Sequence, residues 1–177
     1  RHLSYRRNEG GGRQALLLFD GLAIDQWHKL RGRLTEKLPS IEIDDGACFA
    51  WLPSLTSVSR QTVFSGLRPR EFAVTIESTA AEPTLWAKFW QDAGLRRNEI
   101  VYLKGVKRRE DLSRIADAVG GPSIKIAGIV VDMVDEIVHG ATLGKRGIAS
   151  QIDDWCDTGF VDQLITLLLD QGFEIFL

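Results

Sequence analysis

The feature that most constrains the fold is a long apolar run at residues 124–131, rich in β-branched side chains, which ends at Asp132. A shorter apolar run at 15–19 ends in the same way, at Asp20. Runs that are apolar on both faces are typical of buried strands in a parallel sheet. Because segments with helical spacing alternate with these runs, the sequence predicts an α/β fold with a mainly parallel central sheet.

The other elements follow from apolar spacing and from the positions of glycine and proline. Helices are expected at 22–38, from about 56 to 64, at 84–93, at 109–119 and, as one long amphipathic element, over 147–171. Further strands are expected at 41–43, with an extended piece at 47–52, at 100–103 and at 173–177. Irregular structure or loops are expected at 67–82 and 140–147.

The two ends of the chain differ in character from its centre. Residues 1–14 are polar, basic and rich in glycine, and they predict a linker or entry arm. Residues 15–177 then form a single domain. Because the chain begins without methionine and ends on a strand-like segment, we expect a fragment of a longer protein. Its apolar sheet edge near Leu177 is expected to favour self-association.

Composition limits the classes of partner and the compartment. The net charge is −2, but basic residues cluster in 1–14 and 96–109. These clusters either contact phosphate backbones or form a solvated face. The two cysteines, Cys48 and Cys156, have no metal-finger or disulfide-framework spacing and are expected to be reduced and partly buried. No segment predicts a membrane span or a signal peptide, so we expect a cytoplasmic protein without a membrane partner.

Several polar residues follow apolar, strand-like segments. In open α/β sheets, ligands bind at the carboxyl ends of the strands, where Asp20, Thr56 and Asp132 are expected to meet. Asp135 and His139 are four residues apart, on one side of a helical turn, and carboxylate with imidazole suits Zn or Mn. Taken singly, such residues also serve as a turn, a helix cap or a structural histidine.

The order of these features resembles the alkaline phosphatase superfamily. Residues 16–22, LLLFDGL, are similar to its opening strand, and residues 130–140, VVDMVDEIVHG, to its second metal segment. Residues 52–60, LPSLTSVSR, look like its nucleophile segment. The Pro-x-x-Thr-x-x-Ser-Arg pattern, followed by Gly66 and Pro69, most resembles the PglZ domain. The resemblance covers about 15–177 and implies a three-layer, alkaline phosphatase-like fold that is truncated in this chain.

The resemblance also implies roles for individual residues. Asp20 would bind one metal ion, and Thr56 would be the nucleophile, with its oxygen bridging toward that metal. Asp135 and His139 would bind the second metal, and Asp132 would either be a ligand or support one. Arg60, one turn after Thr56, would add positive charge for the phosphate.

The implied function is a metal-dependent phosphoryl-transfer hydrolase, a phosphatase or phosphodiesterase, in a phage-defence protein of the BREX type. The complete protein would hold two divalent metal ions, Zn or Mn, whereas this fragment is expected to bind none firmly and to be inactive. Implied partners are other components of the defence system, with nucleic acid as a further candidate. The alternative is a non-catalytic interaction module that retains the fold within a defence complex.

Overall fold

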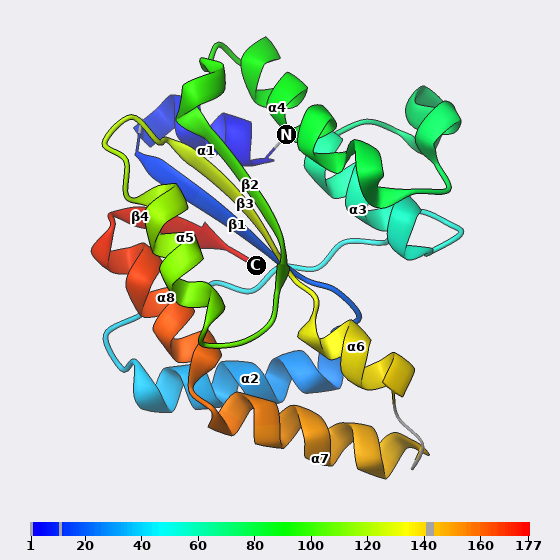
Figure 1. Cartoon of the computed structure of the whole chain (residues 1–177), viewed down its shortest axis with the longest axis vertical. Coiled ribbons are helices and arrows are strands. Elements are labelled where there is room, and N and C mark those ends of the chain that lie inside the picture. The colour runs from blue at the N-terminus through cyan, green and yellow to red at the C-terminus, as the bar shows by residue number, and fades with distance from the viewer. Residues whose placement is uncertain (1, 11, 141–143) are drawn as a thin grey trace.

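The computed structural model describes residues 2–10, 12–140 and 144–177 (Figure 1). Its centre is one parallel sheet with the strand order β2-β3-β1-β4. The strands are β1 (Arg13–Phe19), β2 (Ile100–Val106), β3 (Ile126–Val131) and β4 (Phe173–Phe176). The two runs that most constrain the fold are therefore neighbours, and the parallel α/β class predicted from the sequence is confirmed.

Helices cover both faces of this sheet. The α-helices are α1 (His2–Gly10), α2 (Ile24–Lys37), α3 (Thr56–Ser65), α4 (Glu82–Asp92), α5 (Asp111–Val119), α6 (Met133–Gly140), α7 (Gly144–Asp157) and α8 (Phe160–Asp170). Short 3-10 turns lie at η1 (Pro69–Thr75), η2 (Thr79–Ala81) and η3 (Arg97–Glu99). None of the helices in the described residues is long and apolar enough to cross a membrane.

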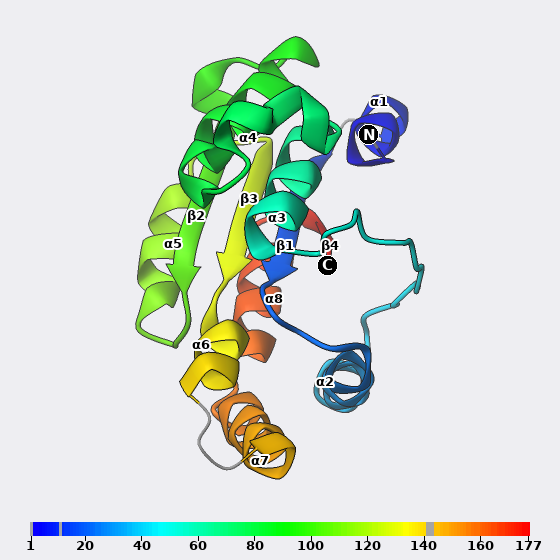
Figure 2. The same cartoon turned by 90° about the vertical axis from the view of Figure 1, so that its right-hand side faces the viewer.

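The three-layer arrangement follows from the alternation of side chains along β3, all of which are buried. Ala127, Ile129 and Val131 belong to the core that β1 and β3 share with α2, α5, α7 and α8. Ile126 and Val130 belong to a second core with side chains of α3 and α4. Figures 1 and 2 show the two helical layers on opposite faces of the sheet.

The α3–α4 layer packs closely on the centre of the sheet. A Cβ atom at Gly128 of β3 would lie 2.9 Å from Trp86 and 3.1 Å from Phe64, so only glycine fits there. The Trp86 indole also donates to the Val101 carbonyl of β2 at 2.8 Å. α3 ends at Gly66, which has a φ of 65°, as the sequence predicted. This packing fixes the start of α3 near the carboxyl ends of the strands.

Three sequence-based predictions about local structure are wrong. Residues 41–43 and 47–52 form no strand, since neither segment joins a ladder of the sheet. The helix predicted over 147–171 is two helices, because Gly159 adopts a φ of 72° between α7 and α8. Cys48 is exposed, whereas Cys156 is buried as expected, and burial raises the pKa of its thiol.

The segment predicted as a linker or entry arm, residues 1–14, contains a helix and the start of a strand. Residues 2–10 form α1, where Arg6 pairs with Glu174 of β4 at 2.6 Å, and β1 begins at Arg13 rather than at Ala15. β4 lies at one edge of the sheet, and self-association through that edge remains a prediction. Of the loop predicted at 140–147, residues 141–143 lie outside the described residues, and α7 already begins at Gly144.

Candidate active site

Two strand-end acids are held by the sheet itself. The Asp20 amide donates to the Val131 carbonyl at 3.0 Å, and the Asp132 amide donates to the Val106 carbonyl at 3.0 Å. Each bond continues a parallel ladder one residue past the end of its strand. Because the strands are parallel, both carboxylates lie at the same end of the sheet, where the carboxyl ends of the strands meet.

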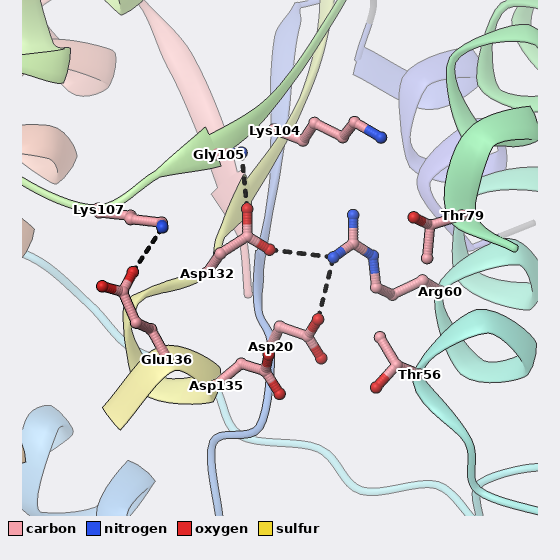
Figure 3. Close-up of a pocket in the computed structure, with 10 residues that line it drawn as sticks. All are labelled: Asp20, Thr56, Arg60, Thr79, Lys104, Gly105, Lys107, Asp132, Asp135 and Glu136. Atoms are coloured by element: carbon pink, nitrogen blue, oxygen red, sulfur yellow. Dashed lines mark hydrogen bonds and ion pairs between the residues drawn. The ribbon is translucent and has the colours of Figure 1, made fainter. Parts of the chain in front are cut away.

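An open cavity of about 560 Å³ lies at this end of the sheet (Figure 3). Its walls come from the ends of β1, β2 and β3 and from the starts of α3 and α6. The residues that line it are Asp20, Thr56, Arg60, Thr79, Lys104, Gly105, Lys107, Asp132, Asp135 and Glu136. Three of the four residues that the sequence assigned to metal binding therefore share one cavity, and His139 is the exception.

Asp135 reaches the cavity because α6 begins directly after β3. The turn after β1 passes close beside it: Gly21 has a φ of 75°, and a Cβ atom there would lie 3.2 Å from the Asp135 Cα atom. His139 lies one helical turn further on, with its side chain 78% exposed and its Nε2 atom 3.3 Å from Asp135 Oδ1. The two residues are thus paired as the spacing predicted, but only Asp135 lines the cavity.

Thr56 is the first residue of α3, and its side chain is exposed. The residue before it, Leu55, caps the helix in an extended conformation without a side-chain bond, so Thr56 does not serve as the cap. The first bond of α3 runs from the Ser59 amide to the Leu55 carbonyl, at 2.9 Å. Earlier amides at a helix start lack intrahelical partners and favour anions, which suits a phosphoryl group beside Thr56.

Arg60 lies in the wall of the cavity and is only 5% exposed. Its Nη1 donates to Asp20 Oδ2 at 2.9 Å and to Asp132 Oδ1 at 3.0 Å. Its Nε and Nη2 donate to the two oxygens of Glu82, at 2.8 and 2.7 Å. Arg60 thus donates four hydrogen bonds to three carboxylates. Because a guanidinium has five N–H donors, one donor is left for a phosphate oxygen, and the phosphate-binding role of Arg60 stays a prediction.

Glu82, the first residue of α4, is completely buried and accepts hydrogen bonds from both Arg60 and a tyrosine. The Tyr102 hydroxyl of β2 donates to Glu82 Oε2. Burial alone would lower the pKa of Arg60, but hydrogen bonds to Glu82 and Asp20 outweigh it and raise that pKa. Burial, and then Glu82, raise the pKa of Tyr102. The network of Arg60, Glu82, Asp20, Asp132 and Tyr102 is called the Arg60 network below.

Only some of these residues could be predicted from the sequence. Asp132 was a candidate, and it turns out to accept bonds from Arg60 and, at 2.6 Å, from the Gly105 amide. Glu82 was missed because a single acid in a segment without periodicity carries no sign of burial. A glycine inside a strand often marks a bulge, so Gly105 was the available signal for this part of the cavity.

The residues present fit a metal site only in part. Asp20, Thr56 and Asp135 offer oxygen donors to one cavity, and such donors suit divalent ions. Within residues 2–10, 12–140 and 144–177, however, no three His, Cys, Asp or Glu side chains are gathered to hold an ion. One oxygen of Asp20 is also paired with the Arg60 cation. A catalytic zinc site has three protein ligands, so the donor set seen here is incomplete.

The domain has three layers around a parallel sheet, and one cavity collects acids from the strand ends and a hydroxyl from the start of a helix. This combination is that of the alkaline phosphatase-like class. A family model described as the BREX system PglZ alkaline phosphatase-like domain matches residues 4–177, so the chain belongs to the PglZ family. Both the predicted family and the predicted fold class are thereby confirmed. A search of curated proteins found no match to the chain.

Proposed function

We propose that this domain is a phosphoryl-transfer hydrolase that acts on phosphomonoesters or phosphodiesters, with Thr56 as its nucleophile. The observation that carries the proposal is the convergence of Asp20, Thr56 and Asp135 on one cavity at the carboxyl edge of a parallel sheet. Membership of the PglZ family, whose domain is alkaline phosphatase-like, supports the same chemistry.

The residues of the cavity divide the chemistry between them. The Thr56 hydroxyl would lose its proton to solvent as its oxygen bonds to phosphorus, while the ester oxygen leaves with the bonding electron pair and takes up a proton from solvent. Water would later bond to the same phosphorus, which releases phosphate and restores the Thr56 hydroxyl. The first amides of α3 would receive the non-bridging oxygens of the phosphoryl group. Asp20 and Asp135 would bind divalent cations, whose positive charge would balance the negative charge of the transferred phosphoryl group.

The alkaline phosphatase-like class generally uses divalent metal ions. We propose that Asp20, Thr56, Asp135 and His139 contribute ligands for two such ions, Zn²⁺ or Mn²⁺. The proposed setting is a cytoplasmic BREX system, where other defence components are partners and nucleic acid is a candidate substrate or partner.

Asp135→Asn tests the proposed function with little disturbance of the fold, because the single ion pair that Asp135 forms within the described residues is with His139. In the protein that carries this domain, we expect hydrolysis of p-nitrophenyl phosphate or bis-p-nitrophenyl phosphate to fall about 100-fold. Asp117→Asn, an exposed change of the same kind on α5, is the matched control. Equal rates for wild type and Asp135→Asn would contradict the proposal.

One observation favours the alternative, a non-catalytic interaction module. Two of the acids at the cavity, Asp20 and Asp132, are paired with Arg60 rather than open to a ligand. If the wild-type protein hydrolyses neither ester yet still assembles with its defence partners, the interaction module is the better description.

Metal titration tests whether this chain binds the proposed metal ions by itself. We expect the 177-residue chain to show no tight, stoichiometric binding of Zn²⁺ or Mn²⁺ by calorimetry, because the described side chains do not reach three strong ligands for one ion. Two tight sites that disappear in Asp20→Ala and Asp135→Ala would show that this chain completes the centre by itself.

A further inference from the structure

A β-bulge in β2 shapes one wall of the cavity. In the pairing of β2 with β3, Leu103 is opposite Ile129 and Val106 is opposite Val131, so β2 has one residue more than β3 over this stretch. Gly105, within the bulge, has a φ of 72°, which favours glycine. Its amide donates to Asp132 Oδ2 at 2.6 Å. The bulge is therefore attached directly to an acid at the edge of the sheet.

The consequence of the bulge is the direction of Lys104. Bulges re-aim side chains and are frequent beside active sites. Lys104 is exposed and lines the cavity. In Figure 3 its side chain extends from the bulge across the upper part of the cavity, toward the side where Arg60 and Thr79 lie. Lys104 and Thr56 thus line the same cavity, from the β2 wall and from the start of α3.

The charges around the cavity make Lys104 unusual. Four carboxylates line the cavity, those of Asp20, Asp132, Asp135 and Glu136, against the three cations Arg60, Lys104 and Lys107. Arg60 is paired with carboxylates, and the Lys107 ammonium lies 2.5 Å from Glu136 Oε2. Among the cations that line the cavity in the described part of the chain, only Lys104 has no ion pair.

We propose that Lys104 binds the non-bridging oxygens of the phosphoryl group in this cavity. The inference rests on the proposed function, since it names a substrate-binding residue of the same site. A phosphate dianion that enters a cavity with a formal excess of carboxylates is repelled unless a cation meets it. The ammonium of lysine is a compact charge with three donors that suits phosphate oxygens.

The test measures the binding of inorganic phosphate to the full chain at low ionic strength. Either two-dimensional NMR or calorimetry gives the affinity. Lys104→Gln is expected to weaken phosphate binding about tenfold or more, since a hydrogen bond to a charged group is lost. Lys104→Arg keeps the charge and is expected to retain most of the affinity. Lys88→Gln on α4 removes an exposed lysine that does not line the cavity and is the matched control.

The outcomes separate this inference from the proposed function, because binding is measured without turnover. Unchanged phosphate affinity in Lys104→Gln, or no phosphate binding by the wild-type chain, overturns the inference. In the protein that carries this domain, Lys104→Gln should raise KM for phosphoesters more than it lowers kcat, whereas loss of the nucleophile acts on kcat. Tenfold weaker phosphate binding in Lys104→Gln supports the inference even if Thr56→Ala leaves turnover intact, a result that would sink the proposed function alone.

Discussion

Thr56→Ala is expected to lower the rate of phosphoester hydrolysis by about 1,000-fold or more in the protein that carries this domain, since loss of a nucleophile removes the covalent route altogether. The fold should survive. Thr56 is exposed and is not the cap of α3, so the free energy of unfolding should change by no more than about 0.5 kcal/mol. Steady-state kinetics and urea denaturation of the same samples check both statements.

Ser57→Ala is the matched control for this prediction. It removes a hydroxyl from the next residue of the same helix, but Ser57 does not line the cavity. We expect its turnover to stay within a few-fold of the wild type. If Thr56→Ala and Ser57→Ala have equal rates, Thr56 is not the nucleophile, whatever the position of its side chain.

The sequence predicted the centre of the fold well because its strands are apolar on both faces. The runs that became β1 and β3 are buried by helices on either side, so their composition shows both the strand and its place inside the sheet. The acids that follow them are then fixed at one edge by topology. The positions of Asp20 and Asp132 could be predicted from the ends of two parallel strands alone.

Short apolar segments gave less reliable predictions. Residues 41–43 and 47–52 have strand-like composition, but in this loop Phe49 and Leu52 are exposed, and no strand edge pairs with it. The break at Gly159 was missed because the apolar residues on each side of it keep a helical spacing of their own. Local pattern does not encode which neighbour a segment will meet, and residues 41–43 and 47–52 meet no strand of the described sheet.

The Arg60 network depends on contacts between distant parts of the chain. Arg60 and Glu82 are 22 residues apart in different helices, and Tyr102 comes from a strand. The position of Arg60, one turn after Thr56, predicted added positive charge for the phosphate, and only the packing of α4 against α3 reveals the buried Glu82 opposite it. The sequence therefore placed Arg60 near the cavity, but it did not predict the carboxylates that Arg60 contacts.

Arg60→Met is expected to lower the free energy of unfolding by about 3–5 kcal/mol, the usual cost of removing one partner from a buried ion pair. The cost arises mainly at Glu82, whose carboxylate is completely buried and would keep only the Tyr102 hydroxyl among the partners that the structure shows. The Asp20 and Asp132 side chains are 11% and 21% exposed, so water can reach them when the guanidinium is gone. Urea denaturation followed by circular dichroism measures the loss.

A second substitution separates this explanation from a simple loss of packing. Glu82→Gln removes the buried charge, so Arg60→Met/Glu82→Gln should be more stable than the sum of the two single changes implies, by about 0.5–3 kcal/mol. Arg114→Met, which breaks an exposed pair with Asp111, should cost no more than about 1 kcal/mol. If the two buried substitutions are additive, the buried charge of Glu82 is not what Arg60 stabilises. The loss would then come from the packing of the Arg60 side chain between α3 and the sheet.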